Sequence, residues 1–168
     1  MTLAQHGRKL LGSSAMIALA ACETSTVPLP APIAPLIAPG VEATWREARK
    51  CRSSHEHWLH AVRVVLNDAA WQPYNTWTPF AKDNLAFPAG SLVVKAEYDE
   101  PDCSHLIGYT LMRKEKAGYW TEGGDWQWQK LDAAGKVLIG GKLGKQCAHC
   151  HVAHCKPPNG FDLTCTPD

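Results

Sequence analysis

Five residues near the end of the chain, Cys147-Ala148-His149-Cys150-His151, have the spacing of a covalent attachment site for haem. Two thiols three positions apart lie on one turn of a helix, where each can add to a vinyl group of the porphyrin. The imidazole of His151, directly after the second cysteine, can then coordinate the iron from the same side. The pattern predicts one covalently attached haem c, bound through Cys147 and Cys150, with His151 as its metal ligand.

A zinc site is the alternative interpretation of this region. Five thiol and imidazole side chains could supply the tetrahedral ligands that zinc prefers: Cys147, Cys150, His151, His154 and Cys155. Zinc does not require a ligand immediately after the second cysteine of such a pair, whereas haem attachment uses one there. The spacing therefore favours haem.

The first 21 residues have the features of a secretory signal. Arg8 and Lys9 precede an apolar stretch that is too short to span a bilayer. Residues 19–22, Leu-Ala-Ala-Cys, resemble a bacterial lipobox, in which Cys22 is acylated and anchors the protein to a membrane without crossing it. The sequence thus predicts a lipoprotein of the bacterial periplasm, on the outer or the inner membrane. An ordinary signal cleaved near Ala21 is the alternative.

The mature chain is expected to contain a tether and one domain. Residues 22–40 are rich in proline, which forbids helix and favours an extended linker, although a disordered leader would have the same composition. Residues 41–168 suit a single small domain. The formal net charge is +1 and no block of basic residues occurs, so nucleic acid is not an expected partner.

Four of the seven cysteines have no role in lipid or haem attachment: Cys51, Cys103, Cys155 and Cys165. An exported protein tolerates disulfides, and an even remainder permits two of them. Sequence alone allows three connectivities, and buried thiols are the alternative.

The pattern of the domain predicts an α+β fold. Apolar side chains recur at helical spacing over residues 54–70, and prolines at 73 and 79 predict a loop after that helix. Alternating or β-branched stretches separated by turn residues predict strands at residues 91–98, 106–114, 126–131 and 137–143. A short helix then carries the cysteine pair. The expected architecture is an antiparallel β-sheet domain with an N-terminal helix and a short C-terminal haem-attachment helix.

This order of elements, ending in the haem motif with no methionine after it, resembles the cytochrome P-460 family, including its cytochrome c′-beta relatives. The matching stretches cover most of residues 54–165 and occur at 62–71, 87–98, 108–128, 132–151 and 161–164. The resemblance implies an antiparallel β protein with a c-type haem, usually a homodimer. Some members oxidise hydroxylamine, and others bind nitric oxide or related small gases. An oxidase of this kind needs an electron acceptor such as a soluble cytochrome.

In the hydroxylamine-oxidising members a lysine is bonded to the haem edge. Its surroundings are similar to residues 90–97, GSLVVKAE, so the resemblance places this lysine at Lys95. Strand alternation puts Glu97 on the same face, which makes Lys95 and Glu97 candidate catalytic residues. A solvent-exposed face, with Lys95 paired to Glu97 or to a neighbour, is the alternative.

One feature of the hydroxylamine oxidisers is missing from the sequence. Those proteins place a carboxylate near the distal haem face on the strand after the lysine, and residues 106–114 contain no Asp or Glu. Glu97 and Glu115 are the nearest carboxylates, and Tyr109 or Arg113 could hydrogen-bond a ligand instead. Enzymatic activity as a hydroxylamine-oxidising oxidoreductase therefore remains one hypothesis among others.

Two further functions fit the same motif. The first is a non-enzymatic cytochrome with an open coordination site that binds nitric oxide or carbon monoxide. The second is an electron-transfer cytochrome whose sixth iron site is filled by Met112 or by one of several histidines: His55, His57, His60, His105 and His154.

Overall fold

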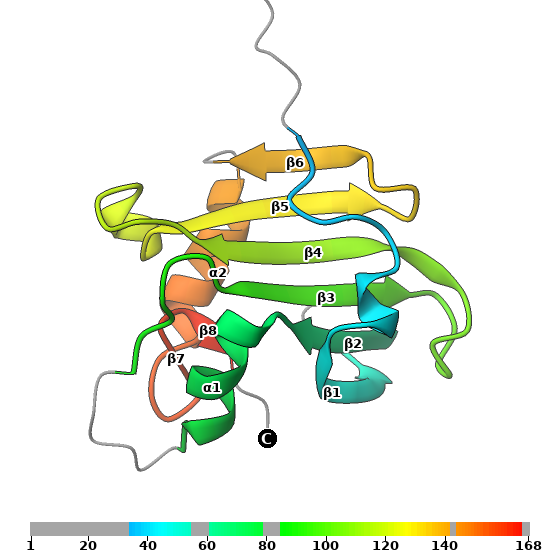
Figure 1. Ribbon diagram of the computed structural model, residues 1–168, viewed down its shortest axis with the longest axis horizontal. Helices are drawn as coiled ribbons and strands as arrows, with labels where there is room; N and C mark the ends of the chain where they lie inside the picture. The colour runs from blue at the N-terminus through cyan, green and yellow to red at the C-terminus, as the bar shows by residue number, and fades with distance from the viewer. Residues whose placement is uncertain (1–33, 55–60, 79–84, 142–143, 166–168) are drawn as a thin grey trace, which may run out of the picture. The chain divides into compact units, whose positions relative to one another are not determined.

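The computed structural model describes residues 34–54, 61–78, 85–141 and 144–165 (Figure 1). The chain divides into residues 32–168, which form the sheet domain, and residues 1–31, which lie outside the described residues. The expected signal and the acylation site at Cys22 therefore also lie outside them. Within the described ranges, no helix has both the length and the apolar character needed to cross a membrane.

Six antiparallel strands form one sheet in chain order: β1 (Arg46–Ser53), β2 (Ala61–Leu66), β3 (Leu92–Tyr98), β4 (Leu106–Lys114), β5 (Trp126–Asp132) and β6 (Val137–Gly141). Each strand pairs with the next, so β1 and β6 are the edges of a meander (Figure 1). The described residues also form two helices, α1 (Asp68–Thr76) and α2 (Lys145–His154), and two short 3-10 turns, η1 (Val41–Ala43) and η3 (Thr121–Gly123). A small hairpin pairs β7 (Gly160–Phe161) with β8 (Thr164–Cys165). The α+β class is confirmed.

The helix predicted over residues 54–70 is wrong where the structure describes it before Asn67. Residues 61–66 form strand β2, in which five of six residues are buried. The sequence of a strand buried on both faces is a continuous apolar run, and the spacing of its apolar residues does not distinguish it from a buried helix. Residues 55–60 lie outside the described residues.

Asn67 caps helix α1, which begins at Asp68, close to the end of the helix predicted over residues 54–70. Its side chain accepts a hydrogen bond from the Ala70 N–H at 3.1 Å, which is the bonding of an N-terminal cap. The expected loop after residue 70 is therefore helical as far as Thr76, with Pro73 inside α1. The strands predicted from residue 91 onward are confirmed to within a residue or two where they are described, and β4 matches at both ends.

Alternation along the strands gives the sheet two faces with separate cores. One, here called the N-terminal face, holds side chains such as Val94 and Tyr109, and residues 34–45 cross it (Figure 1). The other, here called the α2 face, holds Val93, Met112 and Trp128 and is covered by α2. Both faces of the sheet are thus buried over much of their area.

The last part of the predicted linker, residues 34–40, packs on the N-terminal face. Ile37 is buried, and the side-chain amide of Gln129 accepts from the Leu36 N–H at 2.9 Å and donates to the Ala34 carbonyl at 2.8 Å. The Tyr109 hydroxyl accepts from the Gly40 N–H and donates to Glu42, both at 3.0 Å. Polar side chains of the sheet thereby hold this segment in place.

Replacing Tyr109 with phenylalanine should weaken the fold at neutral pH and flatten its loss of stability in alkali. Burial raises the pKa of Tyr109 to about 12, so the unfolded chain loses this proton first as pH rises above the ordinary tyrosine pKa of about 10. Stability from this group is present below pH 10 and disappears as pH rises toward 12. Denaturant unfolding at pH 8 and pH 11 should show a cost of about 1 kcal/mol at pH 8 and a smaller alkaline decrease. An unchanged alkaline decrease would contradict the assignment.

Candidate functional site

Helix α2 carries the whole Cys-x-x-Cys-His motif and rests against the sheet, as the sequence led us to expect of a short helix here. Ala148 is buried and Cys147 packs against the core of the α2 face. The helix can start this close to β5 because residue 144 is glycine: a Cβ at Gly144 would lie 2.5 Å from the Cβ of Trp128. The glycine therefore sets how near the motif lies to the sheet.

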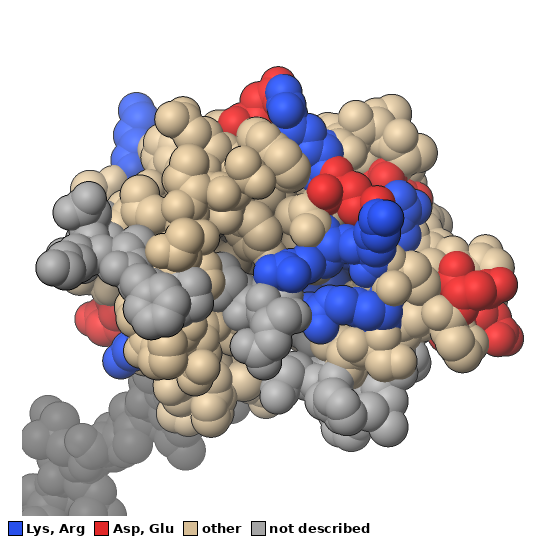
Figure 2. Space-filling view, turned by 90° about the horizontal axis from the view of Figure 1, so that it is seen from below, with Lys and Arg blue, Asp and Glu red and all other residues tan. Residues whose placement is uncertain are grey.

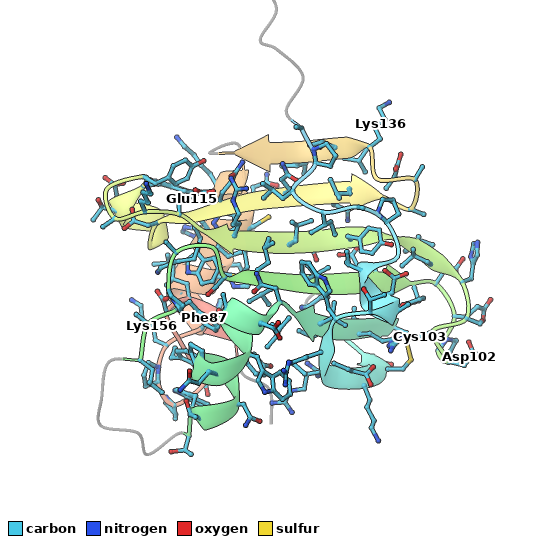
Figure 3. The ribbon with its side chains drawn as sticks, in the orientation of Figure 1. Phe87, Asp102, Cys103, Glu115, Lys136 and Lys156 are labelled. Atoms are coloured by element: carbon cyan, nitrogen blue, oxygen red, sulfur yellow. A yellow bond between two sulfur atoms is a disulfide. The ribbon has the colours of Figure 1, made fainter. Side chains whose placement is uncertain are left out.

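The disulfides leave the two motif cysteines unpaired. Cys51 is joined to Cys103 and Cys155 to Cys165, which is one of the three connectivities that the sequence allowed. Figure 3 shows Cys103 at the end of the sheet remote from α2. Among the described cysteines, the two that belong to no disulfide are Cys147 and Cys150, both half-buried. Their thiols are thus available for another covalent bond.

The imidazole of His151 is fixed on two sides. Its Nδ1 donates to the Leu163 carbonyl at 2.6 Å, and Trp128 packs edge-on against the ring with centroids 4.6 Å apart and planes 69° apart. A carbonyl oxygen only accepts, so the proton must lie on Nδ1. Nε2 is therefore the nitrogen with a lone pair for a metal.

The donors of the zinc alternative do not come together. Cys155 is in a disulfide and His154 is exposed at the end of α2. Within the described part of the chain, the one cluster of metal-ligand type joins His151 to Cys155 and Cys165, whose sulfurs bond to each other. Zinc would require this disulfide to be reduced.

Lys95 and Glu97 lie on the α2 face, as strand alternation predicted. Lys95 is half-buried and stands in register between Val64 of β2 and Thr110 of β4. Only 2% of Glu97 is exposed, and its Oε1 accepts from the Thr110 hydroxyl at 2.9 Å. The Lys130 ammonium lies 3.3 Å from Glu97 Oε2. Glu97 is therefore not solvent-exposed, whereas Lys95 is partly accessible. Lys95, Glu97, Thr110 and Lys130 are called the acid–base cluster below.

Cys147 of the motif and the acid–base cluster lie on the same side of the sheet, because Cys147 packs against the core of the α2 face. Burial raises the pKa of the Cys147 thiol, and the charge of Glu97 raises it as well, while the charge of Lys130 lowers it. Helix α2 therefore brings the first motif thiol to the side of the sheet where Lys95 and Glu97 lie.

No protein-family model matches the chain, and no curated protein is significantly similar to it. The resemblance to cytochrome P-460 rests on the motifs quoted above. What the site can do is therefore argued from its own contacts.

Three residues considered as ligand-binding groups do not lie beside Lys95 on the α2 face. Tyr109 is fully buried on the N-terminal face, bound to Gly40 and Glu42. Arg113 lies four residues after Tyr109 on β4, so its side chain is on the same face as that of Tyr109. Arg113 bonds Glu115 at 2.6 Å, and neither residue reaches the acid–base cluster. Sequence analysis missed Thr110 and Lys130, which take that place. Both could have been found from strand register: Thr110 pairs with Lys95 across β3 and β4, and Lys130 pairs with Thr110 across β4 and β5.

The candidates for a sixth iron ligand are differently placed. Met112 is buried on the α2 face, in register with Val93 and Trp128. His105 bonds Asp99 at 2.7 Å on an exposed turn. His154 is exposed on the same helix as His151, and the three histidines between residues 55 and 60 lie outside the described residues.

Edge strand β1 adds positive charge beside this face. Figure 2 shows Lys and Arg side chains gathered on the surface seen from below, where β1 and its neighbours lie. Arg49 and Arg52 are in register with Val64 and Val62 of β2, so they belong to the α2 face. Guanidinium groups bind carboxylates well, and a haem carries two propionates. Arg49 donates to the Tyr74 hydroxyl at 3.3 Å, and Arg52 is exposed.

Proposed function

We propose that this protein is an exported, lipid-anchored, mono-haem c-type cytochrome of the P-460 type that binds and oxidises hydroxylamine. The observation that carries the proposal is that one sheet face holds the pair Lys95 and Glu97 and is covered by a helix with two unpaired thiols and a histidine whose Nδ1 donates to a carbonyl. Nitric oxide is the other ligand that this site would bind. Electrons would leave to a soluble acceptor such as another cytochrome.

A buried donor near His151 also fits a missing group. Trp128 Nε1 is buried and has no hydrogen-bond partner, although buried indole N–H groups nearly always have one. Its ring contacts the imidazole of His151. A polar group of a bound cofactor would satisfy this donor.

Cys147, Cys150 and His151 would hold the haem, which would supply an iron able to bind a nitrogenous ligand and accept electrons. The chain has to handle the protons that hydroxylamine oxidation releases. Glu97 is suited to this role, because its carboxylate bonds Thr110 on the sheet face against which Cys147 packs. Thr110 holds Oε1 and Lys130 offers a positive charge at Oε2, so the carboxylate keeps one orientation. Lys95 lies two residues before Glu97 on β3 and therefore on the same face, where it could bond to the haem edge.

One observation favours gas binding without turnover. Both oxygens of Glu97 already have partners, which makes the carboxylate less ready to take a proton from a ligand. Gas binding requires no base. This second candidate shares every feature of the haem site with the first and differs only in turnover.

The decisive experiment is the optical spectrum and mass of protein matured in a host that attaches haem c, before and after dithionite. If Lys95 is bonded to the haem, the ferrous Soret band is red-shifted and the mass is lower than simple haem addition by the displaced hydrogens. Lys95→Arg should remove both signs, whereas Lys130→Arg should keep them. An ordinary c-type spectrum with nitric oxide binding and no hydroxylamine turnover would select the gas-binding candidate. Colourless or zinc-containing protein would overturn the proposal.

A further inference from the structure

The turn between β7 and β8 has an unusual backbone. Its two central residues, Asp162 and Leu163, have φ values of +45° and +61°. This is the left-handed conformation that two-residue hairpins of this kind require, and it is normally taken by glycine or asparagine. A branched residue such as leucine adopts it at a cost, and such strain persists only where the surroundings hold it. The turn must therefore be held by its contacts.

Those contacts come from distant parts of the chain. The Asp162 carboxylate accepts from Lys114 Nζ at 2.6 and 2.8 Å and from the Phe87 N–H at 2.8 Å. The Asp162 carbonyl accepts from Trp126 Nε1 at 2.8 Å. Lys114 and Asp162 are about one-eighth exposed, so their ion pair is largely shielded from water. Figure 3 shows Phe87 beside the β7–β8 hairpin.

The hairpin is also closed covalently. Cys165 at the end of β8 bonds to Cys155 at the end of α2, so the turn and the motif helix form one loop. Gly160 opposite Cys165 leaves no room for a side chain, since a Cβ there would lie 2.3 Å from the Thr164 carbonyl oxygen. The hairpin is thus tied to the sheet at one side and to α2 at the other.

What the strained turn presents to the site is a single carbonyl group. The oxygen of Leu163 accepts the hydrogen bond from His151 Nδ1 at 2.6 Å. A bond of this kind on a metal-ligating histidine fixes the tautomer and makes the other nitrogen a stronger donor to the metal. The strength of the axial ligand would then depend on how firmly the carbonyl is held.

We infer that the Asp162–Leu163 turn is the device that positions the axial ligand, and that Asp162 and Lys114 are positioning residues for His151. The inference rests on the proposed function, because it requires iron on Nε2. Neither residue touches the iron site; both act through the Leu163 carbonyl. A looser turn weakens the hydrogen bond, which makes the imidazole a poorer donor and favours the ferrous state.

The test is Asp162→Asn in the full-length haem-loaded protein, with two readouts other than activity. The iron–histidine stretching band of the ferrous protein should move to lower frequency, and the midpoint potential should rise. Glu115→Gln is the matched control, because it breaks a similarly short ion pair, that with Arg113, on the opposite face. It should leave both readouts at their wild-type values.

A second variant guards against loss of folding. Asp162→Asn alone leaves Lys114 without its carboxylate, whereas Lys114→Met with Asp162→Asn removes both buried charges, which is often tolerated. It should shift both readouts in the same direction. Haem-loaded variants with an unchanged stretching band and potential would overturn the inference while leaving the proposed function intact. Wild-type protein without haem would instead refute the proposed function, and with it the inference.

Discussion

Replacing Cys147 and Cys150 together with serine, in protein that also carries Lys95→Arg, should abolish covalent attachment of haem. The Lys95→Arg background removes the bond that Lys95 could make to the haem edge. Both thiols are half-buried on α2 and belong to no disulfide, so nothing else in the described chain competes for them. Without thioether bonds the porphyrin would be held only by His151 and by packing. Extraction in acidified organic solvent should then remove all haem from this variant and none from the wild type. The mass of the protein band reports the same result independently.

Three comparisons make this result specific. Each single variant should keep one thioether bond and therefore retain haem through extraction. Removal of the Cys51–Cys103 disulfide, by Cys51→Ser with Cys103→Ser, should destabilise the fold by about 2–5 kcal/mol but leave haem attached. Haem that resists extraction from the double serine variant in the Lys95→Arg background would contradict the assignment of the motif. Release of zinc by a chelator from wild-type protein would do so as well.

The parts of this fold that sequence predicts well are those whose signals are local. Strands β3, β4 and β5 alternate or are β-branched, and turn residues separate them, so their positions follow from neighbours in the sequence. The cysteine motif is likewise local. Strand β1 was missed because its sequence, REARKCRS, is mostly charged, and only its pairing with β2 makes it a strand. Strand β2 was taken for a helix because burial on both faces hides the period of two.

The candidate site shows the same division between local and distant causes. The resemblance and strand alternation pointed to Lys95 and Glu97 and to their shared face. Thr110 and Lys130 join them only through the register of two hairpins, which no single stretch of sequence encodes. The left-handed turn at Asp162 and Leu163 could not be foreseen at all, since neither residue is glycine and the contacts that hold it come from residues 87, 114 and 126.

Replacing Glu97 with glutamine should lower the turnover of hydroxylamine by about 10²–10⁴-fold, the usual contribution of a general base. This corresponds to about 3–5 kcal/mol in the activation barrier. Glutamine keeps the size of the side chain and an oxygen for the Thr110 hydroxyl, but it cannot take a proton. Lys130 loses its carboxylate partner, yet its side chain is 36% exposed and can turn to water. The measurement is steady-state oxidation with an artificial electron acceptor, at equal haem content.

Binding of nitric oxide separates this effect from damage to the haem site. That reaction moves no proton, so Glu97→Gln should bind nitric oxide as the wild type does. Glu115→Gln removes a carboxylate that is also paired with a cation, but on the opposite face, and it should keep full turnover. If Glu97→Gln and Glu115→Gln both turn over at the wild-type rate, the base is not Glu97. A wild type that binds nitric oxide but shows no turnover would instead indicate a gas-binding protein, in keeping with the absence of a carboxylate from residues 106–114. If only Glu97→Gln is slow while nitric oxide still binds, Glu97 acts as the base. It would then replace the carboxylate that hydroxylamine oxidisers carry on the strand after the lysine, which residues 106–114 lack.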